Sequence, residues 1–244
     1  MTKRTLSIRT ADGVCPAGFL APQGAPSGAA VILYMDAFGP RPALDRMAAR
    51  LAGQGHAVLV PDLFYRFGAY GPLATDAFSD PDKAAMIRKM LSETTQAMTI
   101  ADTGAFLAAL AAEGFGGKVG TTGYCMGGAR ALNAAAHYPD RVVAAASWHG
   151  GNLANGAADS PAANAATIRA RIHVGTAGVD ASFPPEQSAA LVQALREAGV
   201  DHIHENYTGM KHGWCVPDHS VHDEAGAERH WKRLTDLFDE TLRG

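Results

Sequence analysis

The sequence predicts an α/β fold in which a mostly parallel, twisted sheet is covered by helices on both faces and begins with an antiparallel hairpin. Short apolar runs alternate with helical segments along most of the 244 residues, a pattern that strand–helix–strand units produce. The apolar runs are nearly continuous, which is typical of strands buried on both faces. No internal repeat, linker or block of like charge divides the chain, so we predict one domain over residues 1–244.

The first half of the chain begins with a hairpin. Residues 5–22 place alternating apolar side chains on either side of the turn sequence ADG. Later segments are either short apolar runs, as in buried strands, or repeat apolar residues at helical spacing. The predicted elements are a strand at 29–39, a helix at 41–56, a strand at 57–63 and a mostly helical stretch at 80–114 that starts at Asp80 and Pro81.

The same alternation continues in the second half. The helix at 184–199 has proline at its start and glycine at its end, as helix termini favour. Residues 152–166, rich in Ala, Asn and Gly, predict a loop or an irregular helix. The remaining elements are strands at 118–125, 141–150, 171–180 and 200–209, a helix at 126–139, and a last helix with Trp231, Leu234, Leu237, Phe238 and Leu242 on one core-facing stripe.

Composition narrows the classes of function. Apolar residues make up 47% and charged residues 18%, which suits a globular core rather than a disordered chain. A net charge of -3 gives no basic excess, so we do not expect nucleic acid as a partner. No apolar run approaches the ~20 residues of a membrane span, and the N-terminus lacks the apolar core of a signal peptide. The odd count of three cysteines argues against a disulfide framework, so we expect a cytoplasmic protein.

The stretch GYCMGG at residues 123–128 is the strongest candidate for chemistry. Cys125 lies where a predicted strand meets a predicted helix, so a sharp turn there would lift its thiol above the sheet. Gly123 and Gly127 would let the strand and helix pack closely, and the helix N-terminus favours a thiolate. The backbone N–H of Met126 is the natural first donor to an oxyanion. The alternative is a small buried thiol at a tight turn.

A thiol nucleophile needs a base and an acid that orients the base. Asp180 ends a predicted strand in VGTAGVD, and His212 follows the next predicted strand in GMKHGW. Acid and then histidine after the nucleophile, each following a strand, is the order that this kind of fold uses. The alternatives are a helix-capping acid and an ordinary loop histidine.

Other histidines and cysteines predict no metal site. His202 and His204 lie on one face of a predicted strand, but no clustered Cys/His motif accompanies them. We therefore expect neither a metal nor an organic cofactor. Cys215 lies three residues after His212 and is interpreted as a packing residue, with a redox partner for Cys125 as the alternative.

The chain resembles the dienelactone hydrolase family of α/β hydrolases. The resemblance covers essentially the whole sequence, from VILYMDAFG and VLVPDLFYR through KVGTTGYCMGGARAL to TGMKHGW. Its most specific element is the cysteine, because most α/β hydrolases carry serine at that turn. The resemblance implies an α/β-hydrolase fold and a catalytic triad of Cys125, Asp180 and His212.

Two further expectations come from the resemblance alone. The family has an acidic residue, usually glutamate, that engages the thiol, and the matching position here is Asp36. The N–H of Ala37 would be the second oxyanion donor. Family members hold a substrate carboxylate with two arginines, but Val216 stands at the position four residues after the histidine. Arg88 is a candidate for the other arginine.

The sequence therefore predicts a cofactor-free hydrolase of small-molecule ester or lactone bonds that works through a covalent acyl-thioester. The alternatives are a carboxylesterase or thioesterase with another substrate, and a thiol redox or ligand-binding protein on the same scaffold. A dienelactone is the family's type substrate, whereas Val216 favours a less acidic ester, lactone or thioester. We expect a monomer or a small homo-oligomer.

Overall fold

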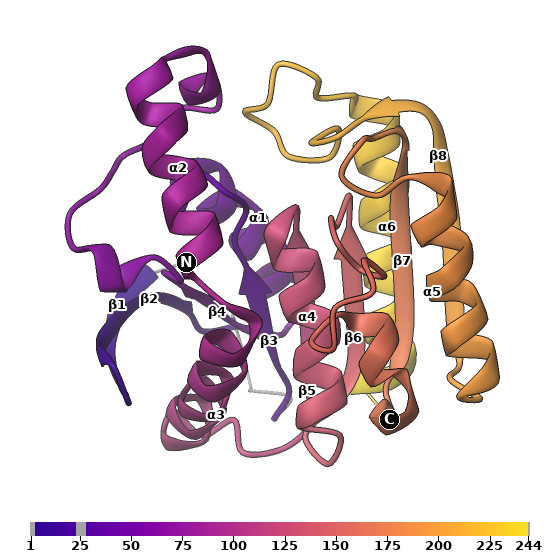
Figure 1. Ribbon diagram of the computed structural model, residues 1–244. Helices are drawn as coiled ribbons and strands as arrows, with labels where there is room; N and C mark the ends of the chain where they lie inside the picture. The colour runs from indigo at the N-terminus through magenta and orange to yellow at the C-terminus, as the bar shows by residue number, and fades with distance from the viewer. Residues whose placement is uncertain (1–2, 23–27, 244) are drawn as a thin grey trace.

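The computed structural model describes residues 3–22 and 28–243, and the strands in these residues form one sheet (Figure 1). The strands are β1 (Lys3–Thr10), β2 (Gly13–Leu20), β3 (Ala30–Tyr34), β4 (Ala57–Pro61), β5 (Val119–Tyr124), β6 (Val142–Trp148), β7 (Arg171–Val179) and β8 (His202–Lys211). Their order across the sheet is β1-β2-β4-β3-β5-β6-β7-β8. The hairpin β1–β2 and the pair β2–β4 are antiparallel, and the other neighbours are parallel. The predicted fold class is confirmed.

Helices cover both faces of this sheet, as the alternating sequence pattern predicts. The helices are α1 (Pro42–Gly53), α2 (Pro81–Glu93), α3 (Gln96–Ala112), α4 (Met126–His137), α5 (Pro185–Glu197) and α6 (Glu224–Leu242), with short 3₁₀ turns η1 (Tyr65–Phe67), η2 (Ala77–Ser79) and η3 (Pro161–Thr167). On one face, the guanidinium of Arg50 in α1 lies 4.6 Å from the ring of Trp231 in α6. In Figure 1, α3, α4 and α5 lie on the opposite face.

The central strands β3, β4 and β5 are buried along their whole length. Burial on both faces explains the continuous apolar sequences of β3 and β4, whereas β5 is equally buried although it contains Thr121 and Thr122. The last helix buries the predicted stripe, including Trp231, Leu234 and Phe238. No helix within residues 3–22 and 28–243 is long and apolar enough to cross a bilayer.

The stretch predicted as mostly helical at 80–114 is two helices. Asp80 caps α2 as predicted, because its side chain accepts hydrogen bonds from the N–H groups of Asp82 and Lys83. The chain then turns at Thr94 and Thr95, and the Thr95 hydroxyl accepts from the N–H of Met98 at 3.2 Å to begin α3. A threonine side chain that caps a new helix therefore explains the break.

The parallel topology brings several strand ends to one edge. Because β3, β5, β7 and β8 are parallel to one another, their carboxyl ends all meet at the same edge of the sheet. Each of these strands is followed within two residues by one of the candidate residues, which are Asp36, Cys125, Asp180 and His212 in chain order. This edge is where open α/β sheets place their functional sites.

Candidate active site

Cys125 occupies a strained turn between β5 and α4. Its backbone has φ 56° and ψ -120°, in a region that residues with side chains seldom adopt. A Cβ atom at Gly123 would clash with the carbonyl of Gly127, and one at Gly127 would clash with the carbonyl of Tyr34 in β3. The two glycines therefore let strand and helix pack as closely as the sequence predicts, and the thiol is half-buried at the N-terminus of α4.

His212 and Asp180 come together beside this turn. The Nδ1 atom of His212 lies 2.7 Å from Oδ2 of Asp180. The other carboxylate oxygen of Asp180 accepts hydrogen bonds from the backbone N–H of Ser182 at 2.8 Å and from its hydroxyl at 2.7 Å. Asp180 is thus held on both oxygens, and its hydrogen bond fixes the orientation of the imidazole.

The thiol of Cys125 contacts the same histidine. Burial alone would lower the pKa of His212, but hydrogen bonds with Asp180 and Cys125 outweigh burial and raise that pKa to about 10. For Asp180, burial acts to raise the pKa, and the hydrogen bonds from His212 and Ser182 more than offset it and hold the pKa below its ordinary value. Both shifts favour an ionised carboxylate beside a protonated imidazole.

A second histidine holds the backbone of the nucleophile. The N–H of Cys125 donates to Nδ1 of His149 at 3.1 Å and also to the carbonyl of Trp148 at 3.2 Å. The ring of His149 lies 4.6 Å from that of His212, centroid to centroid. Burial, followed by the charges of His212 and other histidines, holds the pKa of His149 well below its ordinary value. His149 is therefore a neutral acceptor that keeps the turn in place.

Two backbone N–H groups near the thiol have no acceptor of their own among residues 3–22 and 28–243. They belong to Met126, the first residue of α4, and to Ala37, in the loop after β3. Both residues line the same cavity as Cys125. Free N–H groups beside a nucleophile are suited to a negatively charged oxygen, and the α4 dipole adds to that preference.

Asp36 is fully buried in the loop after β3 and is bound on both oxygens. Arg41 donates to it twice, at 2.7 Å and 2.8 Å, and the same guanidinium reaches Asp218 at 2.7 Å. Nε2 of His219 lies 3.2 Å from its Oδ2, and the N–H of Phe38 donates to its Oδ1 at 3.0 Å. Burial acts to raise the pKa of Asp36, but the bonds from His219 and Arg41 dominate and lower it.

The contacts of Asp36 differ from those that the resemblance implies. Asp36 lines the cavity, but its hydrogen bonds within the described part of the chain go to Arg41, His219 and a backbone N–H rather than to Cys125. Aspartate is shorter than glutamate, and the bidentate arginine holds its carboxylate in place. Asp36 therefore fixes the loop that presents the Ala37 N–H.

Neither position tied to the two arginines of the resemblance supplies a cation to the cavity. Arg88 is exposed on α2 and does not line the cavity; its guanidinium lies 6.0 Å from the ring of Phe78, which does. Val216 is fully buried in the core.

The interpretation of Cys215 as a packing residue agrees with the structure. Cys215 is fully buried, and burial raises the pKa of its thiol well above the ordinary value, so it packs in the core. His204 shares a hydrogen bond with Ser188, and His202 with a backbone carbonyl. No group of three or more potential metal-ligating side chains occurs in residues 3–22 and 28–243.

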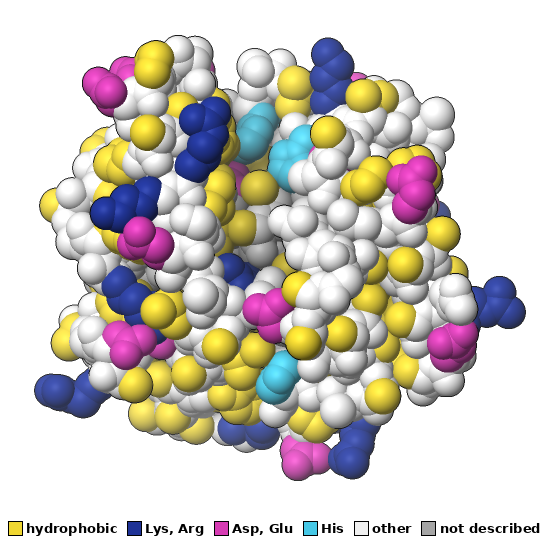
Figure 2. Space-filling model, viewed as in Figure 1, with side chains coloured by type: hydrophobic (Ala, Val, Ile, Leu, Met, Phe, Trp, Pro, Cys, Tyr) yellow, Lys and Arg dark blue, Asp and Glu magenta, His cyan; other side chains and the backbone are white. Residues whose placement is uncertain are grey.

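The thiol opens onto a cavity of about 730 Å³. Its walls come from the loops after β3, β6, β7 and β8, from η2 and α2, and from the first turns of α3 and α4. Figure 2 shows a hollow on this face of the molecule, with histidine side chains at its upper edge and apolar side chains along its walls. The cavity is large enough for a small organic substrate.

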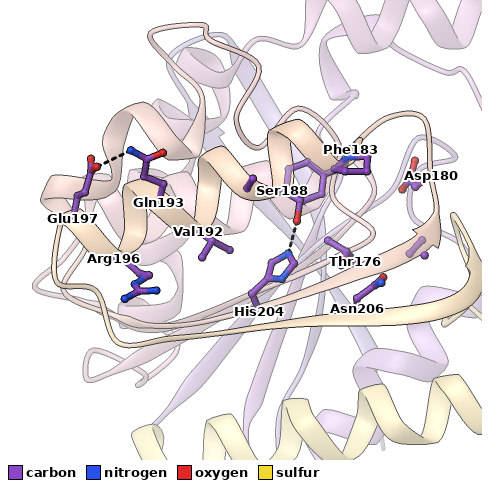
Figure 3. A pocket seen from close by; sticks show the side chains of 14 residues that line it. Thr176, Asp180, Phe183, Ser188, Val192, Gln193, Arg196, Glu197, His204 and Asn206 are labelled. Carbon is purple, nitrogen blue, oxygen red and sulfur yellow. Dashed lines mark hydrogen bonds between the residues drawn. The ribbon is translucent and has the colours of Figure 1, made fainter.

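A second cavity of about 800 Å³ lies between α5 and strands β7 and β8 (Figure 3). Asp180 lies at one end of it, and Ser188 and His204 face each other across it with a hydrogen bond of 3.0 Å. Cys125 and His212 line the first cavity and not this one. The smaller cavity is therefore the candidate active site.

Several residues of the site were not predicted. Each of them forms a hydrogen bond with a predicted residue. Asp180 is bound by Ser182, Asp36 by Arg41 and His219, and the N–H of Cys125 by His149. Only Ser182 had a local signal, since an aspartate followed two residues later by serine is typical of a turn in which the carboxylate accepts the serine N–H.

The chain is similar to known proteins over most of its length. A family model described as the dienelactone hydrolase family matches residues 16–242. A provisionally named carboxymethylenebutenolidase of Methylorubrum extorquens is 26% identical over 240 residues, covering 96% of this chain and 79% of that protein. The carboxymethylenebutenolidase of Rhodococcus opacus is 35% identical over 126 residues, or 48% of this chain and 42% of its own.

Solved structures share the fold. The crystal structure of a provisionally assigned dienelactone hydrolase from Klebsiella pneumoniae matches with a TM-score of 0.85 and 24% sequence identity, covering 98% of both chains. At that identity the match supports the architecture of the sheet and helices.

Proposed function

This chain belongs to the dienelactone hydrolase family, and we propose that it hydrolyses an ester or lactone bond through a Cys125–His212–Asp180 triad and an acyl-thioester intermediate. The observation that carries the proposal is the placement of His212 between the Asp180 carboxylate and the Cys125 thiol. The raised pKa of His212 supports an imidazolium that balances a thiolate.

In the first half-reaction the thiolate of Cys125 attacks the carbonyl carbon, and the carbonyl π electrons move to the oxygen. In this proposal the N–H groups of Ala37 and Met126 bind that oxyanion, and such donors are each worth about 2.7–4 kcal/mol in other enzymes. The oxyanion then collapses, the carbon–oxygen bond to the leaving group breaks, and imidazolium His212 gives its proton to the leaving oxygen.

In the second half-reaction neutral His212 removes a proton from water as the water oxygen attacks the thioester carbon. The new tetrahedral oxyanion uses the same two N–H groups. Its collapse breaks the carbon–sulfur bond, releases the carboxylic acid and returns Cys125 as a thiolate beside protonated His212. When the substrate is a lactone, the alcohol and acid products remain one molecule.

The Cys125→Ala variant tests this function. We expect its hydrolysis of 4-nitrophenyl acetate to fall to background, because neither Cys15 nor Cys215 is among the described residues that line the cavity, while its unfolding midpoint stays near that of the wild type. Cys215→Ala is the matched control, since its thiol is buried away from the cavity. Wild-type turnover by Cys125→Ala would refute the assignment of the nucleophile.

A further inference from the structure

The active-site cavity has an apolar wall that the proposed chemistry does not use. Phe38 lies in the loop after β3, Phe78 in η2 and Leu91 in α2, and all three line the cavity. The rings of Phe38 and Phe78 meet edge to face, with their centroids 5.6 Å apart and an angle of 79° between their planes. Met126 and Ala129 extend the wall along α4, beginning directly after the nucleophile. These five residues are called the apolar wall below.

One ring of the apolar wall is exposed. Four large apolar side chains are exposed in the described part of the chain, and two of them, Phe78 and Val179, line this cavity. Phe78 is 42% exposed. Apolar surface that lines a cavity beside a nucleophile is surface that a bound substrate can remove from water. An apolar group placed against Phe78 would therefore gain free energy on binding.

The charged groups near the apolar wall are buried or already bound. Arg130 also lines the cavity, but its Nε and Nη1 atoms are buried from solvent and its Nη2 atom donates to the Thr94 carbonyl. The side-chain oxygen of Gln96 is buried from solvent as well. Asp36 accepts from Arg41 on both carboxylate oxygens. A charged group on the substrate would lose its water against this wall without gaining an equivalent partner, which costs free energy.

The chemistry assigns the apolar wall to the acyl part of the substrate. Cys125 follows β5, and in the sheet β3 lies on one side of β5 while β7 and β8 lie on the other. His212, which protonates the leaving oxygen in the proposed mechanism, follows β8, and so the leaving group faces the side of β7 and β8. Lys211, an exposed cation that lines the cavity, belongs to that side. The acyl group extends the other way, toward η2 and α2, which lie beyond α4 from β7 and β8 (Figure 1).

We propose that the apolar wall binds an uncharged aromatic acyl group, so that this protein prefers esters of apolar, aryl-substituted carboxylic acids. The inference rests on the proposed hydrolase function and names the substrate class of that site. An aromatic ring against Phe78 buries its own surface and that of the wall, and it can adopt the edge-to-face or offset contacts that ring pairs favour. A cavity of about 730 Å³ has room for such a ring in addition to a leaving group.

The first test compares three 4-nitrophenyl esters that share one leaving group. They are the acetate, the phenylacetate, and a phenylacetate with a carboxymethyl group at the para position of its ring. Each kcat/KM is divided by the rate constant for hydrolysis of the same ester by hydroxide, which removes differences in intrinsic reactivity. We expect the wild type to favour the phenylacetate over the acetate by roughly 10- to 100-fold, because a ring is buried. The added carboxylate should abolish most of this preference.

Variants at Phe78 locate the preference. Phe78→Ala removes the exposed ring and should lower the phenylacetate-to-acetate ratio by roughly 5- to 10-fold. Phe78→Leu keeps an apolar side chain and should retain part of the ratio. The matched control is Ile203→Ala, because Ile203 is another exposed large apolar residue but does not line the cavity. Its ratio should equal that of the wild type.

Three results would each overturn the proposal: a wild-type ratio near one, a carboxylated ester hydrolysed as fast as the phenylacetate, or a wild-type ratio in Phe78→Ala. A binding measurement separates the acyl site from the proposed function. In calorimetric titrations, the Cys125→Ala protein should bind methyl phenylacetate roughly 10-fold or more tightly than methyl acetate. That difference, in a protein whose wild type hydrolyses no ester, would refute the function and leave the acyl site standing. Ester hydrolysis without that difference would refute the acyl site alone.

Discussion

Two aspartates at the same edge of the sheet differ in what their carboxylates bind. Asp180 accepts from Ser182 on one oxygen and faces the His212 ring with the other. Asp36 is held by the Arg41 guanidinium and by a second histidine, His219. Both have lowered pKa values, but only Asp180 is connected to the thiol through one imidazole. The hydrogen-bond partners of each carboxylate therefore assign its role.

The variant Asp180→Asn tests that assignment. The amide removes the negative charge that raises the pKa of His212, so the imidazolium loses its proton at lower pH. We expect kcat/KM for an activated ester to fall roughly 10²- to 10⁴-fold, and the basic limb of its pH profile to move to lower pH.

A matched control is Ser182→Ala, which removes one hydrogen bond from the same carboxylate and should shift the basic limb much less. A pH profile of Asp180→Asn whose basic limb coincides with that of the wild type would exclude the role of Asp180 in supporting the imidazolium.

The sequence predicts catalytic candidates better than the residues that support them. Cys125, Asp180 and His212 each follow a strand, and that order is visible in the chain. The residues that hold Asp36 are not visible in this way. Asp218 contacts Arg41, and His219 contacts Asp36 itself, but both lie far away in sequence and reach these partners only after folding. Whether a buried side chain such as that of Arg130 has hydrogen-bond partners likewise depends on the folded structure alone.

At the scale of elements, the contact between α4 and strands β3 and β5 determines whether the thiol is presented at all. Gly127 lies against the carbonyls of Tyr34 and Met35, and Gly123 lies against the first turn of α4. The sequence pattern G-x-C-x-G predicts this close approach because no other residue fits at either glycine. The division of the helical stretch at Thr94 and Thr95 was missed, since apolar spacing continues across it.

Replacing Gly127 with alanine should therefore destabilise the protein. A methyl group would overlap the Tyr34 and Met35 carbonyls, and backbone atoms cannot move aside cheaply. We expect the free energy of unfolding, measured with urea, to fall by about 2 kcal/mol or more.

The control is Gly116→Ala, at an exposed glycine where a Cβ atom would meet only the Ala111 side chain at 3.8 Å. That change should stay within about 0.5 kcal/mol of the wild type. Equal stability of both variants would show that the close approach of α4 to β3 carries no energetic weight.

At the scale of the whole molecule, two buried histidines, one on β7 and one on α6, link folding stability to pH. His173 is stacked against Trp148, and His230 shares a hydrogen bond with the hydroxyl of Tyr124 at 3.0 Å. Burial is the largest cause that lowers the pKa of His173 to about 4 and that of His230 to about 3. Both rings are therefore neutral in the folded protein at pH values where the unfolded chain protonates them.

The lowered pKa values of His173 and His230 make the folded protein less stable at acidic pH. Between pH 6.5 and about pH 4 the unfolded state binds more protons, so stability falls as the pH falls. As the pH falls from 7 to 5, each of the two histidines should lower the free energy of unfolding by about 2 kcal/mol.

Urea denaturation at these two pH values measures the loss. In His173→Gln the free energy of unfolding should fall by about 2 kcal/mol less between these pH values than in the wild type. In His137→Gln, which changes an exposed ring on α4, the loss should equal that of the wild type. A loss in His173→Gln as large as in the wild type would contradict protonation of this ring on unfolding.

The central claim concerns a covalent bond to one sulfur, which can be observed directly. The wild-type protein is mixed with 4-nitrophenyl acetate, quenched in acid within milliseconds, digested and examined by mass spectrometry. We predict an acetyl group on the peptide that contains Cys125, formed before steady state and lost as free acid accumulates. Turnover without that adduct, or an adduct that forms and decays at turnover rates on another residue, would contradict the proposed mechanism.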